Sequence, residues 1–532
     1  MKRLIAGILS IFLCAGLLGG CGGEKEPHTP TGDGLTWDED YTGPVYTRPP
    51  SEELDELTLT YDPKVSMNPL LSGDFTNRTL FSLIYQSLFI VDRDYKVEPL
   101  LCKSFTVSQD MKSYTFYPEA AKFSDGSVLT AGDVMATLLA AKESDVYSGR
   151  FHHVTEILLS NDGGIRVNLD TPYEDLPVLL DIPILKSSQL QSPRPLGTGP
   201  YVLDTTGEIA LLRKNTDWWC SATLPVSVGA IRLTEAGTAA EVRDEFEFED
   251  LDLVCTDPGS DHYADYRCDY ELWDCQNNIF LYLACNMDSR VFSIPEIRQM
   301  LPLAVDRVGL ADKYYRGFAQ AAALPAVPGS PYYSQVLAER YAYDGGKALT
   351  QAVAQAQLAP DITISLLVNS DDSLRLRVAR DIRDMLQSCG LTVIMKEEAT
   401  SSYMRTLELR DYDLYLGQTK LSANMDLSAF FSSGGGLRYG NFNSVSLYTL
   451  CTEALANHGN YYTLHQTLMN DGRLCPILFR SYAVYATRGL LTDLTPARDN
   501  IFYYSLGKTM EKAQKVQTVA TETTPETTLA EG

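Results

Sequence analysis

The patterns that would assign a catalytic activity are missing from this sequence of 532 residues. No serine stands in a Gly-x-Ser-x-Gly frame, no histidine opens the His-Glu-x-x-His motif of zinc peptidases, and no Walker-type phosphate loop occurs. Histidine is scarce, with six in the chain. Neither the pair His152-His153 nor the pair His458 and His465 has the nearby cysteine or acid pattern of a metal site. We therefore expect a protein that is not an enzyme and that holds neither a metal nor a cofactor.

Basic residues and cysteines are too few for two further classes of protein. With 44 Lys and Arg against 69 Asp and Glu, the formal net charge is −25, so no cationic excess is available to neutralise nucleic-acid phosphates. The 11 cysteines are scattered over a long chain, whereas a disulfide scaffold is small and dense in cysteine. The composition therefore argues against a nucleic-acid partner, and most cysteines are expected to be buried thiols.

The apolar run at the N-terminus, residues 4–17, is too short for a comfortable membrane span. It follows a basic start and precedes residues 18–21, Leu-Gly-Gly-Cys, so residues 1–20 are predicted to be a signal peptide. The tetrad matches the lipobox of bacterial lipoproteins, and this match implies that Cys21 becomes the lipidated first residue. A plain secretory signal and an uncleaved anchor are weaker alternatives.

Two motifs in the body of the chain carry a family resemblance. The first, 122–134, contains a Ser-Asp-Gly turn signal, and Thr130 with Asp133 predicts a capping box that begins a helix. The second, 197–201, reads Gly-Thr-Gly-Pro-Tyr. At this separation they resemble the motifs of extracytoplasmic solute-binding proteins of peptide-type ABC importers, which include oligopeptide-, dipeptide- and nickel-binding proteins. With later motifs, the resemblance covers residues 57–508.

The resemblance implies an α/β, periplasmic-binding-protein-like fold of two α/β lobes joined by a hinge, with an additional inserted domain, of the class II, cluster C type. Two crossings between domains I and III, near Cys285-Asn286 and Pro476-Ile477, would form the hinge. The expected divisions are a signal peptide (1–20), a tether (21–53), domain I (54–74, 194–285 and 476–512), domain II (75–193), domain III (286–475) and a disordered tail (513–532).

Local patterns predict several elements of these domains. Residues 57–61 alternate as a strand, and residues 79–88 have the spacing of a helix. An apolar strand at 362–368, a helical stripe from Leu374 to Leu386 and a strand at 391–395 form a βαβ unit, for which a parallel pair is expected.

One further helix is expected to begin with Ser293 as its cap. Pro302 departs from the family signature there, and it should shorten this helix because proline cannot continue the hydrogen-bond ladder.

Two loops supply the candidate ligand-binding residues, because the family places them on opposite walls of the ligand cleft. The first loop holds Ser72, Gly73, Asp74 and Phe75. The second, between Gly417 and Phe431, supplies Gln418, Thr419, Lys420 and Asp426.

Peptide binders of the family carry in the second loop an aspartate that neutralises the free amine of the ligand. Here residues 420–424 contain no acid, and Asp426 is the only acid of the loop. Two alternatives follow: Asp426 takes over the amine, or Lys420 faces the cleft and the ligand carries an anionic or strongly accepting group.

The leading hypothesis is a substrate-binding lipoprotein of an ABC importer, which captures a peptide or other small solute and delivers it to a permease. Its expected partners are the permease and ATPase subunits and, through the lipid anchor, the outer face of the cell membrane; the protein would act as a monomer. A ligand-sensing lipoprotein of the same fold, not coupled to import, is the alternative. A lipid-anchored surface hydrolase is a weaker one.

Overall fold

The computed structural model describes residues 56–502, except 225, 227, 260–265, 360–361, 492–493 and 499. The predicted signal peptide, Cys21, the tether and the C-terminal tail lie outside the described residues. Within the described part, no helix has the length and apolar character needed to cross a membrane.

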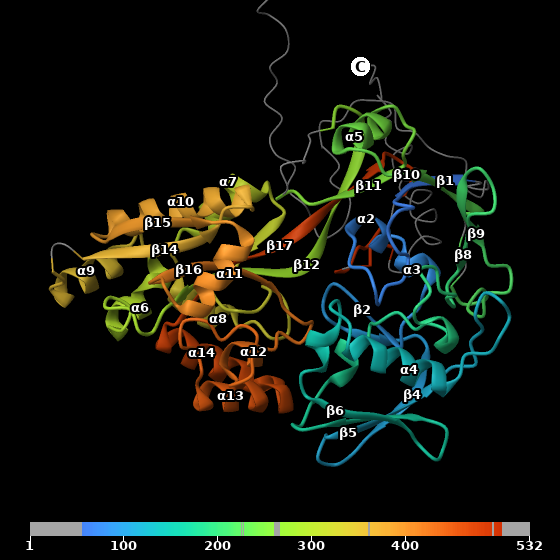
Figure 1. Ribbon diagram of the computed structural model, residues 1–532, viewed down its shortest axis with the longest axis horizontal. Helices are drawn as coiled ribbons and strands as arrows, with labels where there is room; N and C mark the ends of the chain where they lie inside the picture. Colours follow the sequence, from blue (N-terminus) through green and yellow to red (C-terminus); the bar gives the residue numbers. More distant parts are fainter. Residues whose placement is uncertain are drawn as a thin grey trace, which may run out of the picture.

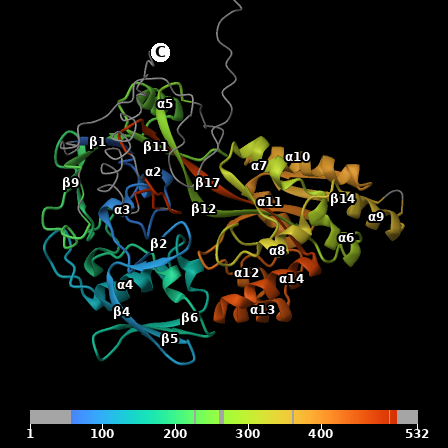
Figure 2. The ribbon, with the colours of Figure 1, turned by 180° about the vertical axis from the view of Figure 1, so that it is seen from behind.

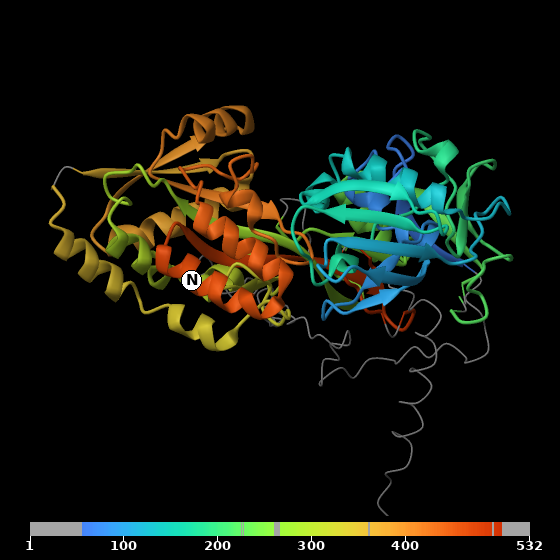
Figure 3. The ribbon, with the colours of Figure 1, turned by 90° about the horizontal axis from the view of Figure 1, so that it is seen from below.

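The described residues form two α/β lobes that lie side by side (Figure 1). Lobe 1 contains most of residues 56–256, and lobe 2 contains most of residues 286–473. Figure 3 shows the same two bodies from below, with strands running between them.

Lobe 1 is built on two four-stranded sheets and a small hairpin. The first sheet has the order β1 (Glu56–Tyr61), β10 (Ala230–Glu235), β9 (Ala210–Lys214), β8 (Tyr201–Asp204). The second, antiparallel, has the order β4 (Cys102–Val107), β5 (Ser113–Pro118), β7 (Ile165–Leu169), β6 (Val154–Leu159). The hairpin pairs β2 (Phe89–Val91) with β3 (Val97–Pro99). The helices of this lobe are α2 (Phe75–Arg78), α3 (Phe81–Ile84), α4 (Ala131–Lys142) and α5 (Ala239–Glu247).

One larger sheet joins lobe 1 to lobe 2. Its order is β11 (Leu253–Thr256), β17 (Leu474–Thr487), β12 (Tyr270–Cys285), β16 (Leu414–Lys420), β14 (Thr363–Asn369), β15 (Thr392–Glu398), and β13 (Ala319–Ala321) also pairs with β17. The helices of lobe 2 are α6 (Pro295–Met300), α7 (Arg307–Tyr315), α8 (Gln335–Ala338), α9 (Lys347–Ala356), α10 (Ser373–Ser388), α11 (Thr400–Leu409), α12 (Ser428–Phe431), α13 (Val445–Ala456) and α14 (Tyr461–Asp471).

Strands β12 and β17 are the connection between the lobes, as Figure 2 shows from behind. Their antiparallel pairing is interrupted between Gln276 and Phe280, where Asn278 has a φ of 57°. From Ile279 onward β12 also pairs with β16 of lobe 2. The crossing therefore lies in the middle of both strands, whereas the sequence analysis places it at the end of β12 and the start of β17.

The elements with strong local signals are confirmed. Thr130 and Asp133 form the capping box of α4, because each side chain bonds the other residue's backbone amide. β14, α10 and β15 form the βαβ unit with a parallel pair, and the apolar stripe of α10 is buried on this sheet. The helix before Pro302 ends at Met300 and continues as a short 3₁₀ turn, as expected.

Two helix predictions are wrong. Residues 79–88 contain only the four-residue α3, and Tyr85 is already extended. The reason is tertiary: Gly199 N donates to Ile84 O (2.9 Å), and a Cβ atom at Gly197 or Gly199 would clash with the same carbonyl. Ser293 is also not the cap of α6, which begins after Ile294 without a side-chain cap.

The two family motifs meet in lobe 1. Ser124 N, in the turn of the first motif, donates to Gly197 O of the second (3.0 Å). The second motif then presses its glycines against the end of α3. The two motifs thus contact each other and the end of α3, and so help to hold α3 in place.

Candidate ligand-binding cavity

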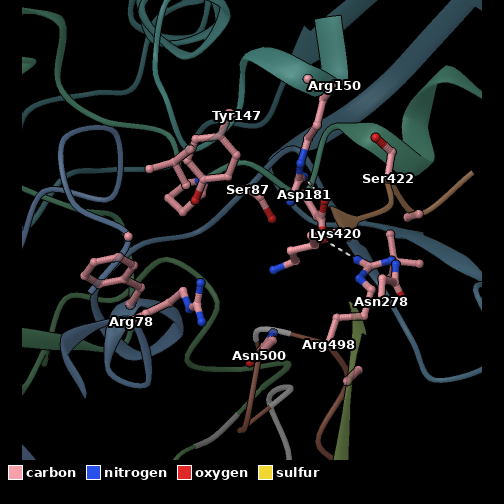
Figure 4. A pocket seen from close by; sticks show the side chains of 18 of the residues that line it. Arg78, Ser87, Tyr147, Arg150, Asp181, Asn278, Lys420, Ser422, Arg498 and Asn500 are labelled. Carbon is pink, nitrogen blue, oxygen red and sulfur yellow. Dashed lines mark hydrogen bonds and ion pairs between the residues drawn. The ribbon is translucent and has the colours of Figure 1, made fainter. Parts of the chain in front are cut away.

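A cavity of about 690 Å³ lies between the two lobes. Lobe 1 supplies most of its wall, from the α2–α3 segment, β2 and the 3₁₀ turn at Ser148–Phe151. Lobe 2 supplies residues 419–423, which are the end of β16 and the loop after it. Asn278 of the β12 interruption and residues 497, 498 and 500 close the cavity on the side of the crossing strands (Figure 4).

Three of the eight ligand-binding candidates from the sequence line this cavity: Gly73, Thr419 and Lys420. A Cβ atom at Gly73 would make only ordinary contact with Val146, so no close backbone approach demands glycine there. Both predicted loops therefore reach the cavity, one from each lobe, but each through only part of its predicted residues.

The other candidates of the first loop support its shape. Ser72 Oγ accepts from Asp74 N (3.2 Å), and Asp74 caps α2 by accepting from Asn77 N (2.9 Å). The ring of Phe75 packs on Tyr482 of β17, with 4.6 Å between ring centroids. None of these three residues is among the lining residues of the cavity.

Gln418 and Asp426 of the second loop also point elsewhere. Gln418 Oε1 accepts from Arg480 Nη1 (3.1 Å). Asp426 Oδ1 accepts from the amide (2.8 Å) and the hydroxyl (2.6 Å) of Ser428, and its side chain is 12% exposed. Its other oxygen lies 3.8 Å from Nε2 of His153 in lobe 1.

Asp426 thus belongs to a second contact between the lobes, which we call the seam. The seam is formed by His153, Tyr173 and Glu174 of lobe 1 with Asp426, Ser428, Tyr448 and His458 of lobe 2.

The polar groups of the seam satisfy one another. His153 Nδ1 lies 2.9 Å from Asp170 Oδ1 and its Nε2 lies 3.3 Å from Ser428 Oγ, while Glu174 accepts from His458 N (2.6 Å). Burial raises the pKa of Tyr173 well above its ordinary value. The seam is therefore a packed contact.

A cationic cluster that the sequence analysis does not name also lines the cavity. The carboxylate of Asp181 pairs with two guanidinium groups, those of Arg150 and Arg498. The Arg150 guanidinium also lies 5.0 Å from the centre of the Tyr147 ring. One negative charge therefore holds two positive charges at the wall of the cavity.

Two more cations approach the same space from other elements (Figure 4). Arg78, at the end of α2, donates to Tyr482 Oη (3.2 Å) and lies over the ring of Phe75. Lys420, at the end of β16, is exposed within the cavity. The cations thus come from both lobes.

Neutral polar groups complete the lining. Asn278 accepts from Tyr95 Oη (2.7 Å), and burial raises the pKa of Tyr85 far above its ordinary range, so that its hydroxyl stays protonated and donates to Met67 O (2.8 Å). Ser82, Ser87 and Ser422 line the cavity, but the described lining residues include no histidine to act as their base, and no cysteine. The described residues also contain no group of three or more His, Cys, Asp or Glu side chains that could hold a metal.

Arg78, Arg150, Asp181 and Arg498 were missed by the sequence analysis. Arg78 lies one helical turn after the first predicted loop, so extending that loop by a turn would have included it. The other three come from segments up to 348 residues apart, and no local pattern marks them; Arg498 meets Asp181 only through the folded chain.

The cavity and the two-lobed architecture agree with a family comparison. The family model described as bacterial extracellular solute-binding proteins, family 5 middle, matches residues 96–439. The chain belongs to this family. Family 5 is thus confirmed as the family that the two sequence motifs indicate.

The chain is also similar to curated proteins and to solved structures. It is 23% identical over 354 residues to the glutathione-binding protein GsiB of Salmonella typhi, a match that spans 61% of this chain and 66% of the relative. The match thus spans slightly less than two thirds of the length of this relative.

Among solved structures, the ABC transporter substrate-binding protein CtaP of Listeria monocytogenes covers 85% of this chain and 98% of its own, at 18% identity and a TM-score of 0.70. The oligopeptide-binding protein AppA of Bacillus subtilis, solved with a nonapeptide, covers 86% and 99%, at 18% identity and a TM-score of 0.60. These structures confirm the α/β, periplasmic-binding-protein-like fold.

Proposed function

We propose that this family 5 protein captures a small solute in the cavity between its lobes and delivers it to the permease of an ABC importer. The cavity itself is the observation that carries the proposal, because both lobes line it and, in the described part of the chain, the strands β12 and β17 run from one lobe to the other. A volume of about 690 Å³ is within the range of small-molecule sites. Glutathione, agropinic acid and a nonapeptide appear in the names of relatives and neighbours, so the family model leaves the solute of this chain open.

Capture would proceed by rotation of the lobes about the interrupted β12–β17 pairing. The β12–β17 pairing is interrupted between Gln276 and Phe280, where Asn278 has a left-handed backbone. In this short segment the backbone angles can change while the paired residues on either side keep their hydrogen bonds. The seam and the cavity would then open and close together, because both lie between the same two lobes.

Delivery requires partners and a location outside the cytoplasm. We propose the permease and its ATPase subunits as partners, a monomeric state, and anchoring to the outer face of the cell membrane through Cys21. Cys21→Ser should abolish incorporation of a radioactive fatty acid into the protein. Equal labelling of the wild type and the variant would refute the anchor and leave the binding function untouched.

Native mass spectrometry of freshly purified protein tests the binding function, followed by uptake of the identified molecule in cells with and without the gene. The proposal predicts one small molecule per protein, released unchanged, and slower uptake without the gene. A bound molecule with unaltered uptake would favour ligand sensing. A molecule released as cleavage products would favour a hydrolase.

A further inference from the structure

The net charge of the described cavity lining is opposite in sign to the net charge of the whole chain. The described lining holds four cationic and two acidic side chains: Arg78, Arg150, Lys420 and Arg498, and Asp145 and Asp181. In the whole chain, acids outnumber bases by 69 to 44. A wall with more bases than acids is therefore not a consequence of composition, and it gives the cavity a local positive field.

Arg498 supplies an independent sign of an anionic ligand. Its side chain is only 9% exposed, and one guanidinium nitrogen, Nη2, pairs with Asp181. The other, Nη1, is buried and has no hydrogen-bond partner among the described residues. A buried charged donor without an acceptor is costly, and Arg498 is one of the residues that line the cavity, so an oxyanion bound there would satisfy this donor once the guanidinium group turns toward it.

The cations are distributed over both lobes rather than gathered at one point. Arg78 and Arg150 belong to lobe 1, whereas Lys420 ends β16 of lobe 2. Figure 4 shows the labelled side chains of Arg78, Lys420 and Arg498 around the same space. A ligand with one anionic group could neutralise one side, while a ligand with two could be held from both lobes at once.

We infer that the solute is a small organic molecule with two or more oxyanionic groups, either carboxylates or phosphates. The inference rests on the proposed function, because it names the class of solute for that cavity. Anionic groups held by Arg78 or Arg150 in one lobe and by Lys420 in the other link solute binding to closure of the lobes. The neutral donors and acceptors of the lining, such as Asn278 and Tyr147, remain for the uncharged part of the solute.

The test uses ligand-free full-length protein, prepared by unfolding, dialysis and refolding, and three matched pairs of probes in calorimetry at low salt. Glutarate is compared with glutaramide, glutamyl-glutamate with glutaminyl-glutamine, and glycerol 3-phosphate with glycerol. The first two pairs report on carboxylates and the third on phosphate. We expect at least one anionic member to bind at least 10-fold tighter than its neutral partner, with an affinity that falls as salt is added.

Lys420→Met tests whether this preference arises in the cavity. It should weaken the best anionic probe by about 10- to 100-fold, the range for loss of one hydrogen bond to a charged group, and leave the neutral partner unaffected. Lys103→Met is the matched control, because Lys103 is an exposed lysine of β4 away from the cavity lining. Equal thermal unfolding of both variants and the wild type would show that the fold is kept.

Neutral members that bind as tightly as their anionic partners would overturn the inference, as would a co-purified solute that is neutral or cationic at pH 7. The proposed function survives both of these outcomes, since a solute is still bound. If no probe binds and native mass spectrometry finds no co-purified molecule, the proposed function fails and this inference with it.

Discussion

The two places where the lobes meet differ in how they use their charges. At the seam, the acids already have partners within the protein: Asp426 accepts from Ser428, and Glu174 accepts from the backbone amide of His458. At the cavity, cations outnumber acids and Arg498 keeps a buried donor without a described partner. This difference shows that position in the second loop does not determine the role of a residue, because Lys420 lines the cavity whereas Asp426, six residues later, belongs to the seam.

The largest effect is expected from the acid that holds the cationic cluster together. Asp181→Asn leaves Arg150 and Arg498 without the carboxylate between them, and unpairing charges that are mostly buried should lower the free energy of unfolding by about 3–5 kcal/mol. Urea denaturation measures it. Asp145→Asn is the control, because Asp145 also lines the cavity but is exposed, and it should change stability by no more than about 0.5 kcal/mol. Equal effects of both would mean that the cluster is not a stabilising unit.

A pH-dependent effect is expected from a buried histidine of lobe 2. His153 is bonded at both ring nitrogens, whereas His465 of α14 is fully buried and neither of its ring nitrogens has a hydrogen-bond partner among the described residues. Burial lowers the pKa of His465 to about 3. Below pH 6.5 the unfolded chain therefore binds a proton that the folded protein does not bind. The free energy of unfolding is highest above the unfolded pKa of 6.5 and decreases as the pH falls toward 3.

His465→Leu should remove this dependence. Its stability relative to the wild type should rise by about 2 kcal/mol between pH 7.5 and pH 5, since one pKa unit corresponds to about 1.4 kcal/mol. Chemical denaturation at the two pH values measures the difference. A constant difference between the variant and the wild type would show that His465 gains its proton as readily in the folded protein as in the unfolded chain.

A crossed pair of variants separates the two contacts directly. Lys420→Met should weaken binding of an anionic solute by about 1.4–2.8 kcal/mol and leave stability nearly unchanged. Asp426→Asn should instead leave binding of that solute nearly unchanged, while lowering stability by about 1–2 kcal/mol through its bonds to Ser428. Calorimetry measures the change in binding free energy for each variant, and urea denaturation measures the change in the free energy of unfolding. If Asp426→Asn instead abolishes binding of an amine-bearing solute, the inference that the solute is anionic is wrong.

The smallest effect is expected in the overall dimensions of the protein. Removal of the solute should break the contacts of the seam, such as that between His153 and Ser428, and increase the radius of gyration. Small-angle scattering with and without saturating solute measures it. An unchanged radius would count against rotation about β12 and β17.

The sequence predicts those elements whose determinants lie close together in the chain. The capping box of Thr130 and Asp133, the βαβ unit of lobe 2 and the early end of the helix before Pro302 are all set by residues within a few turns of one another. The helix expected over residues 79–88 fails because Gly197 and Gly199, more than a hundred residues away, press on the carbonyl of Ile84.

The cavity is less predictable for the same physical reason. The family resemblance locates two loops on it, yet Arg150, Asp181 and Arg498 are brought together only by the tertiary fold. Asp426 shows a local signal that was overlooked, because an aspartate two residues before a serine in a loop commonly bonds that residue's amide. That pattern favours a structural role over a ligand contact.

A crystal structure of the protein with its co-purified solute tests the central claim most directly. We predict solute density in the cavity between the lobes, with oxyanionic groups within hydrogen-bond distance of Lys420 on one side and of Arg78, Arg150 or Arg498 on the other. Solute bound outside this cavity, or inside it with no oxyanionic group near any of these four side chains, would contradict the account.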